Sequence, residues 1–245
     1  MNKSFFPFIV MIALFSAIFI SCDKDKGVTL SGTIIGEGSD WDKVSVTYED
    51  PLSWDLEDTW DPVWAATVPI SNGKFSLELP TPEARYFQPF TDDMLYSQLK
   101  VSDKTAKGVA AYICAQITQE TNGGTLEGIA TLILAEVKQA SITIVQYIYA
   151  DKKVNISGTD ETMYGGFGSV EFNLKMKKGW NTVILSIKAS SNDELTMTYK
   201  TGNVPSGAVW MTGLDMGARS GIDITNTDIE ALLGKIYNNV HTWQK

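Results

Sequence analysis

From residue 28 onward the chain is dominated by short runs in which apolar and polar residues alternate. Period-two alternation is typical of strands that bury one face and leave the other in water. Three later runs are apolar on both faces, as in central strands covered from both sides. The runs of both kinds span residues 28–34, 43–48, 63–70, 75–79, 109–116, 129–137 and 142–149. The pattern predicts an all-β body.

Turn residues between these runs indicate how the strands are grouped. Asn72-Gly73 separates two alternating runs and predicts a hairpin, because both positions of such a turn favour positive φ. Asn122-Gly123-Gly124 predicts a second turn, and Pro80 and Pro82 end the first group of strands. We expect two β-sandwich-like units, over residues 28–105 and 106–245.

One helix is expected, at the C-terminal end. Thr227 and Glu230 have the spacing of a capping box, in which each side chain binds a backbone N–H of the first turn. Apolar residues then recur at helical spacing, at positions 229, 232, 233, 236, 237 and 240. The pattern predicts an amphipathic helix over residues 227–243.

Two groups of residues carry family resemblances. Residues 28–82, ending in Asn72-Gly73-Lys74-Phe75 and Pro80, resemble the prealbumin-like (carboxypeptidase-regulatory-like) β-sandwich. That resemblance implies an accessory structural module with no catalytic residues. The pair Tyr149-Ala150-Asp151 and Lys177-Lys178-Gly179-Trp180-Asn181 is similar to a feature of uncharacterised lipoproteins of Bacteroidetes bacteria. This second resemblance covers residues 105–212 and implies location and architecture only.

The first residues have the pattern of a secretory signal. Lys3 is followed by residues 4–21, which carry no charge. The run ends in Phe19-Ile20-Ser21-Cys22, which resembles the bacterial lipobox, in which the cysteine is acylated and becomes the new N-terminus. We therefore expect a signal peptide over 1–21, a palmitate-type lipid on Cys22 and a polar tether over 22–27. The expected location is the outer membrane, with the cell surface as one orientation. An uncleaved anchor is the alternative.

The composition excludes several classes of function. The formal net charge of −9 disfavours nucleic acid, which is bound through Lys and Arg. With one histidine, His241, the chain lacks the residues for a His₃ zinc site or a Ser-His-Asp triad. Cys114 lies in an apolar run and is expected to be buried and inert. No catalytic residue is assigned, although paired carboxylates leave a glycan hydrolase open.

Residues 37–64 combine tryptophan with acidic residues. Four of the seven tryptophans and nine carboxylates fall in this segment, against a single lysine. Indole rings beside carboxylates suit a glycan, and the carboxylates alone suit calcium. The candidate ligand-binding residues are Trp41, Trp54, Trp60, Asp55, Asp58 and Asp61. The alternative is structural: Trp64 belongs to the core, and the segment covers an apolar face.

The expected function is that of a non-enzymatic, lipid-anchored envelope protein that binds a glycan or another envelope component. A structural or assembly subunit of a surface complex, docking through an edge strand or the C-terminal helix, is the alternative. Trp180 follows the turn at Gly179 and is expected to point inward, because Lys177 and Lys178 already give this turn its solvated face.

Overall fold

The computed structural model describes residues 27–35, 41–48, 63–90, 99–121, 124–138, 141–160, 168–189 and 195–212. These residues contain no α-helix, one short 3₁₀ helix, η2 (Ala84–Tyr86), and the strands of a single mixed sheet. The strands are β1 (Thr29–Ile35), β2 (Lys43–Thr47), β3 (Ala66–Pro69), β4 (Lys74–Glu78), β5 (Gln88–Pro89), β6 (Lys100–Val101), β7 (Lys107–Thr121), β8 (Gly124–Lys138), β9 (Ser141–Ala150), β10 (Val154–Asp160), β11 (Gly168–Met176), β12 (Gly179–Ala189), β13 (Leu195–Thr201) and β14 (Val209–Thr212). The predicted all-β character is confirmed.

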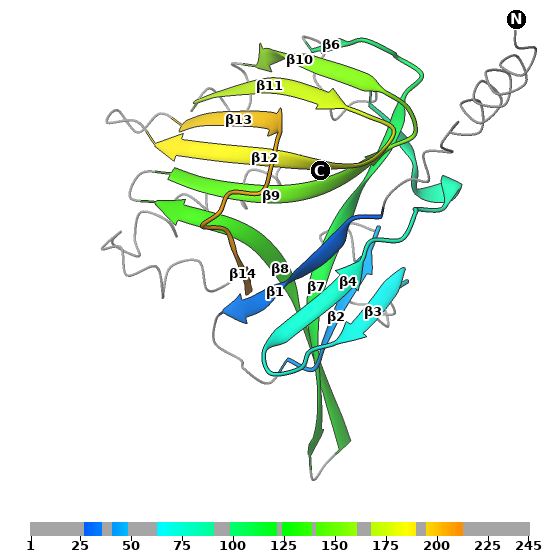
Figure 1. The fold of residues 1–245 in the computed structure, drawn as a ribbon, viewed down its shortest axis with the longest axis vertical. Coiled ribbons are helices and arrows are strands. Elements are labelled where there is room, and N and C mark those ends of the chain that lie inside the picture. The colour runs from blue at the N-terminus through cyan, green and yellow to red at the C-terminus, as the bar shows by residue number, and fades with distance from the viewer. Residues whose placement is uncertain are drawn as a thin grey trace, which may run out of the picture.

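The sheet has the order β4-β1-β14-β8-β7-β9-β12-β13-β11-β10-β6, with β2 and β5 attached to β7 and β3 attached to β2. Two pairs are parallel, β1 with β14 and β11 with β13, and the other pairs are antiparallel. Figure 1 shows the upper strands as a curved layer, with β1 to β4 lying together below it.

The long strands β7 and β8 connect these two parts of the molecule. Along one edge of β9, β8 pairs with Ser141–Val145 and β7 takes over from Tyr147 to Ala150. Beyond that point β7 and β8 pair with each other and project as a hairpin, seen at the bottom of Figure 1. At 15 residues each, these strands are long enough to belong to both parts.

Two apolar clusters lie on opposite faces of β9 and β12. Trp180 and Ile184 of β12 belong to the larger cluster, with Leu30, Val44, Leu77, Ile113, Leu134, Tyr147 and Trp210. Val183, Leu185 and Ile187 belong to the other, with Val154, Ile156, Phe172, Leu174 and Met197. Because strand residues alternate between faces, β9 and β12 each contribute apolar side chains to both clusters, and for β9 this confirms the central strand that the sequence predicted over 142–149.

Strands from both sides of residue 105 are hydrogen-bonded to one another. β2 pairs with β7 over Lys43–Thr47, and β1 pairs with β14 at Ile34 and Ile35. The larger cluster also draws on residues from both sides of this position. The two units predicted from the sequence therefore share one sheet. The helix predicted over 227–243 lies outside the described residues.

Trp180 confirms the expectation that it points inward. Its side chain is buried and meets the ring of Tyr149 edge-on at 5.3 Å. Gly179 before it has a φ of 93°, which glycine adopts without strain. The turn between β11 and β12 therefore places Lys177 and Lys178 in solvent and Trp180 in the larger cluster.

Candidate functional site

A cavity of about 410 Å³ lies between β1, β14 and the fork where β8 and β7 meet β9. It opens because β1 pairs with β4 over Thr29–Thr33 but reaches β14 only at Ile34 and Ile35. The first half of β1 thus diverges from the neighbouring strand. Twelve residues line the cavity: Thr29, Leu30, Ser31, Gly32, Thr33, Ile35, Leu134, Tyr147, Val204, Ala208, Val209 and Trp210.

The edge of β1 that faces the cavity carries backbone groups that β4 does not use. Val28 and Ile34 hydrogen-bond to Leu79 and Gly73 on the β4 side. In an antiparallel ladder this pairing alternates along the strand. The N–H and C=O groups of Thr29, Ser31 and Thr33 therefore point to the opposite edge, away from β4.

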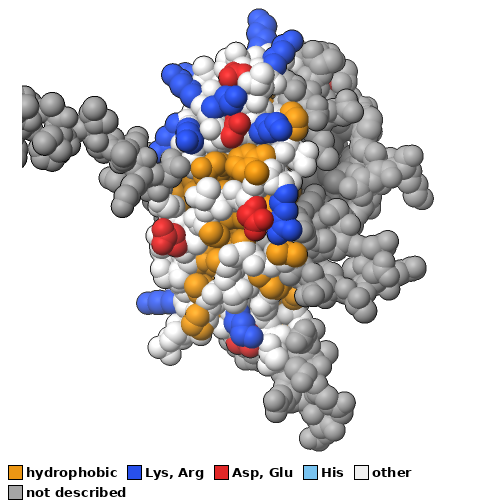
Figure 2. Space-filling model, turned by 90° about the vertical axis from the view of Figure 1, so that its right-hand side faces the viewer, with side chains coloured by type: hydrophobic (Ala, Val, Ile, Leu, Met, Phe, Trp, Pro, Cys, Tyr) orange, Lys and Arg blue, Asp and Glu red, His pale blue; other side chains and the backbone are white. Residues whose placement is uncertain are grey.

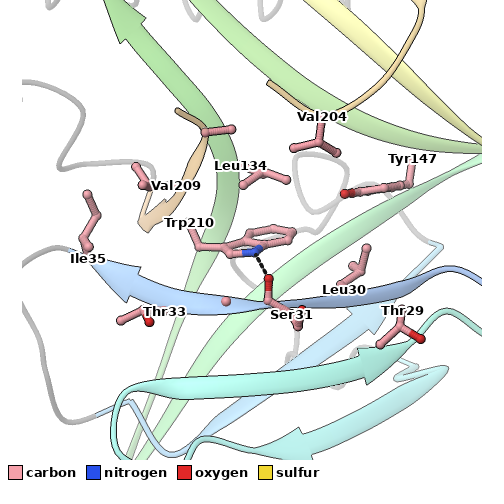
Figure 3. Close-up of a pocket in the computed structure, with 12 residues that line it drawn as sticks. Thr29, Leu30, Ser31, Thr33, Ile35, Leu134, Tyr147, Val204, Val209 and Trp210 are labelled. Atoms are coloured by element: carbon pink, nitrogen blue, oxygen red, sulfur yellow. Dashed lines mark hydrogen bonds between the residues drawn. The ribbon is translucent and has the colours of Figure 1, made fainter. Parts of the chain in front are cut away.

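Trp210 closes one side of the cavity and binds this edge. Its indole Nε1 donates a hydrogen bond to the carbonyl oxygen of Ser31 at 3.2 Å (Figure 3). The ring also meets Phe75 edge-on, with 5.3 Å between the ring centroids. A Cβ at Gly32 would lie 2.7 Å from Cδ1 of Trp210, so only glycine lets the indole lie against β1.

Tyr147 supplies the polar group on the opposite wall. Figure 3 shows its hydroxyl oxygen directed into the cavity, toward Leu134. Burial raises the pKa of Tyr147 to about 12, so the hydroxyl stays protonated at neutral pH. None of the hydrogen bonds within the described part of the chain involves this hydroxyl. It is therefore a neutral donor available to a bound molecule.

The rim of the cavity is apolar. Val204 and Val209 line it and are 41% and 37% exposed. Val63 is the only other exposed large hydrophobic residue within the described ranges, and it does not line the cavity. Exposed aliphatic side chains at the mouth of a hollow are typical of a binding surface.

The cavity is also uncharged. Its twelve lining residues include no Asp, Glu, Lys, Arg or His. Its polar groups include the hydroxyl of Tyr147 and the N–H groups on the edge of β1 that faces away from β4. This set of groups suits hydrogen bonding and apolar contact with a neutral molecule.

The structure places one of the ligand residues that the sequence predicted. Trp41 lies just before β2, partly buried against the larger cluster, and its Nε1 has no partner among the described residues. Trp64 is partly buried as well. Trp54, Trp60, Asp55, Asp58 and Asp61 lie outside the described residues, as does Cys22. The described residues contain no cluster of three or more metal-ligating side chains.

Sequence reasoning missed the residues that build the cavity. Trp210 stands in an ordinary strand-like run, Ala208 to Met211, and Tyr147 in a long apolar strand. Neither has a local signal that separates it from a core residue. Cys114, by contrast, is fully buried, which confirms the packing role expected for it.

Comparison of the chain with protein-family models, with curated proteins and with solved structures finds no match. Within the described ranges, no helix is both long enough and apolar enough to cross a membrane.

Proposed function

We propose that this protein is a non-enzymatic, lipid-anchored protein of the cell envelope that binds a small neutral molecule in the cavity between β1 and β14. The observation that carries the binding role is a cavity without a charged lining residue in a chain with a net charge of −9. Moving an unpaired charge out of water is costly, so such a lining selects against charged ligands. The volume of about 410 Å³ lies in the range of small-molecule sites.

The lining also indicates the chemistry of the ligand. Leu134, Val204 and Val209 offer aliphatic contact, while Tyr147 and the edge of β1 offer hydrogen bonds. A molecule with a large apolar part and one or two acceptors satisfies both. We therefore favour an amphipathic ligand over a free glycan, which needs more polar partners for its hydroxyl groups.

The envelope location rests on the sequence. The uncharged run over residues 4–21 and the lipobox-like Phe19-Ile20-Ser21-Cys22 support export and acylation at Cys22. Several acyl chains give stable membrane attachment, since each buried CH₂ contributes about 0.8 kcal/mol. Labelling with a clickable fatty acid tests this part: the wild-type chain incorporates the label, and Cys22→Ala does not.

A neutral fluorescent probe, N-phenyl-1-naphthylamine, tests the binding role. We expect saturable binding that Val204→Glu weakens by about tenfold or more, because a carboxylate at the rim opposes an apolar ligand. Val63→Glu, the same change at an exposed valine outside the cavity, leaves binding unchanged. No saturable binding, or equal loss in both variants, contradicts the proposal.

The N–H groups of Thr29 and Ser31, which neither β4 nor Trp210 uses, favour one second function, strand addition by a partner protein in a surface complex. Ser31→Pro removes an N–H that points away from β4, so it blocks strand addition on that edge. If a partner adds a strand to this edge, the membrane-extracted wild-type protein migrates as a larger complex on a native gel, and the Ser31→Pro variant migrates as the free chain. Probe binding is then absent from the wild type.

Glycan or calcium binding by residues 37–64 stays a prediction. Its direct test is a glycan array probed with the chain from residue 23, with and without calcium. Binding that depends on Trp41 would move the ligand site from the cavity to this segment.

A further inference from the structure

Lysines gather at one end of the curved layer of strands. Lys152 and Lys153 occupy the turn between β9 and β10, and Lys177 and Lys178 the turn between β11 and β12. Lys104 lies in the adjoining segment before β7, and Lys107 begins β7, where its N–H donates a hydrogen bond to Asp151. These turns meet because β9, β11 and β13 end where β10 and β12 begin (Figure 1).

Strand register adds three lysines on the outer face beside these turns. Lys100 pairs with Ser157, Lys175 with Asn155, and Lys200 with Asn173. All three side chains are exposed, while Ile156 and Leu174 next to them are buried on the other face. The lysines of the turns and of this face form what we call the lysine end.

The lysine end is strongly positive in an acidic protein. It holds nine of the 20 basic residues of the chain, Asp103 and Asp151 are the acidic residues of its turns, and Glu171 lies further along the same face of β11. The ion pairs within the described ranges are Arg85 with Glu83 and Lys138 with Glu136, so none involves the lysine end. Eight of its nine lysines are exposed, Lys152 is partly buried, and the ion pairs above leave their charges without a carboxylate partner, which fits a surface that meets an anionic partner.

The described chain begins on the same side of the molecule. β1 starts on the right of Figure 1, the side that carries the lysine end, and Figure 2 views this side directly, with lysines across its upper part. A chain of contacts links the start of β1 to the lysine end. The N–H of Leu79 donates to the carbonyl of Val28, and the hydroxyl of Tyr48 donates to the carbonyl of Pro80. The ring centroids of Tyr48 and Trp180 are 6.1 Å apart. Trp180 follows directly on Lys178 and Gly179.

The tether from the expected lipid is short. Four residues lie between Cys22 and Gly27, and an extended residue spans at most about 3.6 Å. Gly27, where the described chain begins, therefore lies within roughly 20 Å of the membrane surface, and the start of β1 within roughly 25 Å.

We propose that the lysine end lies on the anionic headgroups of the membrane that carries the lipid anchor. The proposal rests on the acylation of Cys22 in the proposed function, but not on the ligand cavity. A lysine near an anionic bilayer contributes about 1 kcal/mol of attraction. The contact fixes the orientation of the body, and the opposite ends of β9 to β12 face away from the membrane.

Vesicle sedimentation of the unacylated chain from residue 23, which keeps every described residue, tests the surface separately from the anchor. We expect binding to vesicles of equal parts phosphatidylglycerol and phosphatidylcholine that falls with added salt, and little binding to pure phosphatidylcholine. Lys175→Glu with Lys178→Glu and Lys200→Glu lowers binding at least about tenfold. The control triple variant, Lys43→Glu with Lys74→Glu and Lys188→Glu, makes the same change in net charge at exposed lysines outside the lysine end.

Equal losses in the two triple variants would show that net charge, not the lysine end, determines binding, and would overturn the proposal. Wild-type chain that ignores the anionic vesicles but binds heparin would also overturn it, in favour of a soluble acidic partner. Circular dichroism confirms that both variants are folded. Absence of fatty-acid labelling would show that Cys22 is not acylated, whereas vesicle binding by the unacylated chain tests the lysine end alone. A failure of the anchor and a failure of the lysine end are therefore distinguishable.

Discussion

The indole Nε1 of Trp210 donates a hydrogen bond to the carbonyl oxygen of Ser31 at 3.2 Å, across a sequence separation of 179 residues. This bond ties the last described strand to the first, on the wall of the cavity. Trp180, the other tryptophan of the larger cluster, has a buried Nε1 with no partner within the described residues. The two residues therefore offer a matched comparison.

We expect Trp210→Phe to destabilise the protein more than Trp180→Phe does. Both changes replace a buried indole by the smaller phenyl ring. The first also leaves the Ser31 carbonyl without its donor, which lowers the free energy of unfolding by about 1–3 kcal/mol more. The second removes a donor that has no described acceptor. Equilibrium unfolding in urea measures the two free energies. Equal losses would show that the bond to Ser31 contributes nothing.

Gly32→Ala should disturb the same wall. The added methyl group would lie 2.7 Å from Cδ1 of Trp210, and such overpacking costs about 1–3 kcal/mol. Gly202→Ala is the control, since its Cβ would lie 3.4 Å from Cγ1 of Ile184. We expect the melting temperature to fall for Gly32→Ala and to change little for Gly202→Ala. A tolerated Gly32→Ala means that the indole does not lie against β1.

The Cys114 thiol should be unreactive in the folded protein. It is fully buried, and burial raises its pKa to about 12, so almost no thiolate is present at neutral pH. In a Cys22→Ala background, iodoacetamide should label Cys114 rapidly in denaturant and very slowly in native buffer. Mass spectrometry follows the reaction. Rapid native labelling would place this strand at the surface.

Tyr147 should make stability depend on pH at the alkaline end. Its pKa is about 12 in the folded protein against 10.0 for an ordinary tyrosine. The folded state therefore holds its proton more tightly, and the resulting stability is complete below pH 10 and lost as the pH rises through 12. The loss is on the order of 2 kcal/mol. Tyr147→Phe removes this dependence, so the difference in unfolding free energy between the two proteins should change over that window. A constant difference would show that the hydroxyl is well hydrated.

The sequence predicted the strands well because strand patterns are local. The alternating runs at 28–34 and 43–48 became β1 and β2, and the apolar runs became β7, β8 and β9 within a few residues. β7 ends at Thr121 and β8 begins at Gly124, which agrees with the position that the sequence predicted for the end of one strand and the start of the next. Each of these signals needs only neighbouring residues.

The cavity was not predictable in the same way. It exists because β1 pairs in parallel with β14 only at Ile34 and Ile35, at the end of β1, while the first part of β1 lies apart from β14. Alternation gives the faces of a strand but not its distant partner, so nothing in the sequence joins Ser31 to Trp210. The predicted ligand residues came from an unusual local composition, which marks a segment as distinctive without showing where its side chains lie.

Locating the bound probe within the protein tests the central claim most directly. We would titrate the isotope-labelled chain from residue 23 with N-phenyl-1-naphthylamine and follow its amide and methyl NMR signals. We expect saturable shifts at Thr29 to Thr33, Leu134, Tyr147 and Val204 to Trp210, with Val63 and Trp41 unaffected. Shifts centred on Trp41, or scattered without saturation, would contradict a ligand site between β1 and β14.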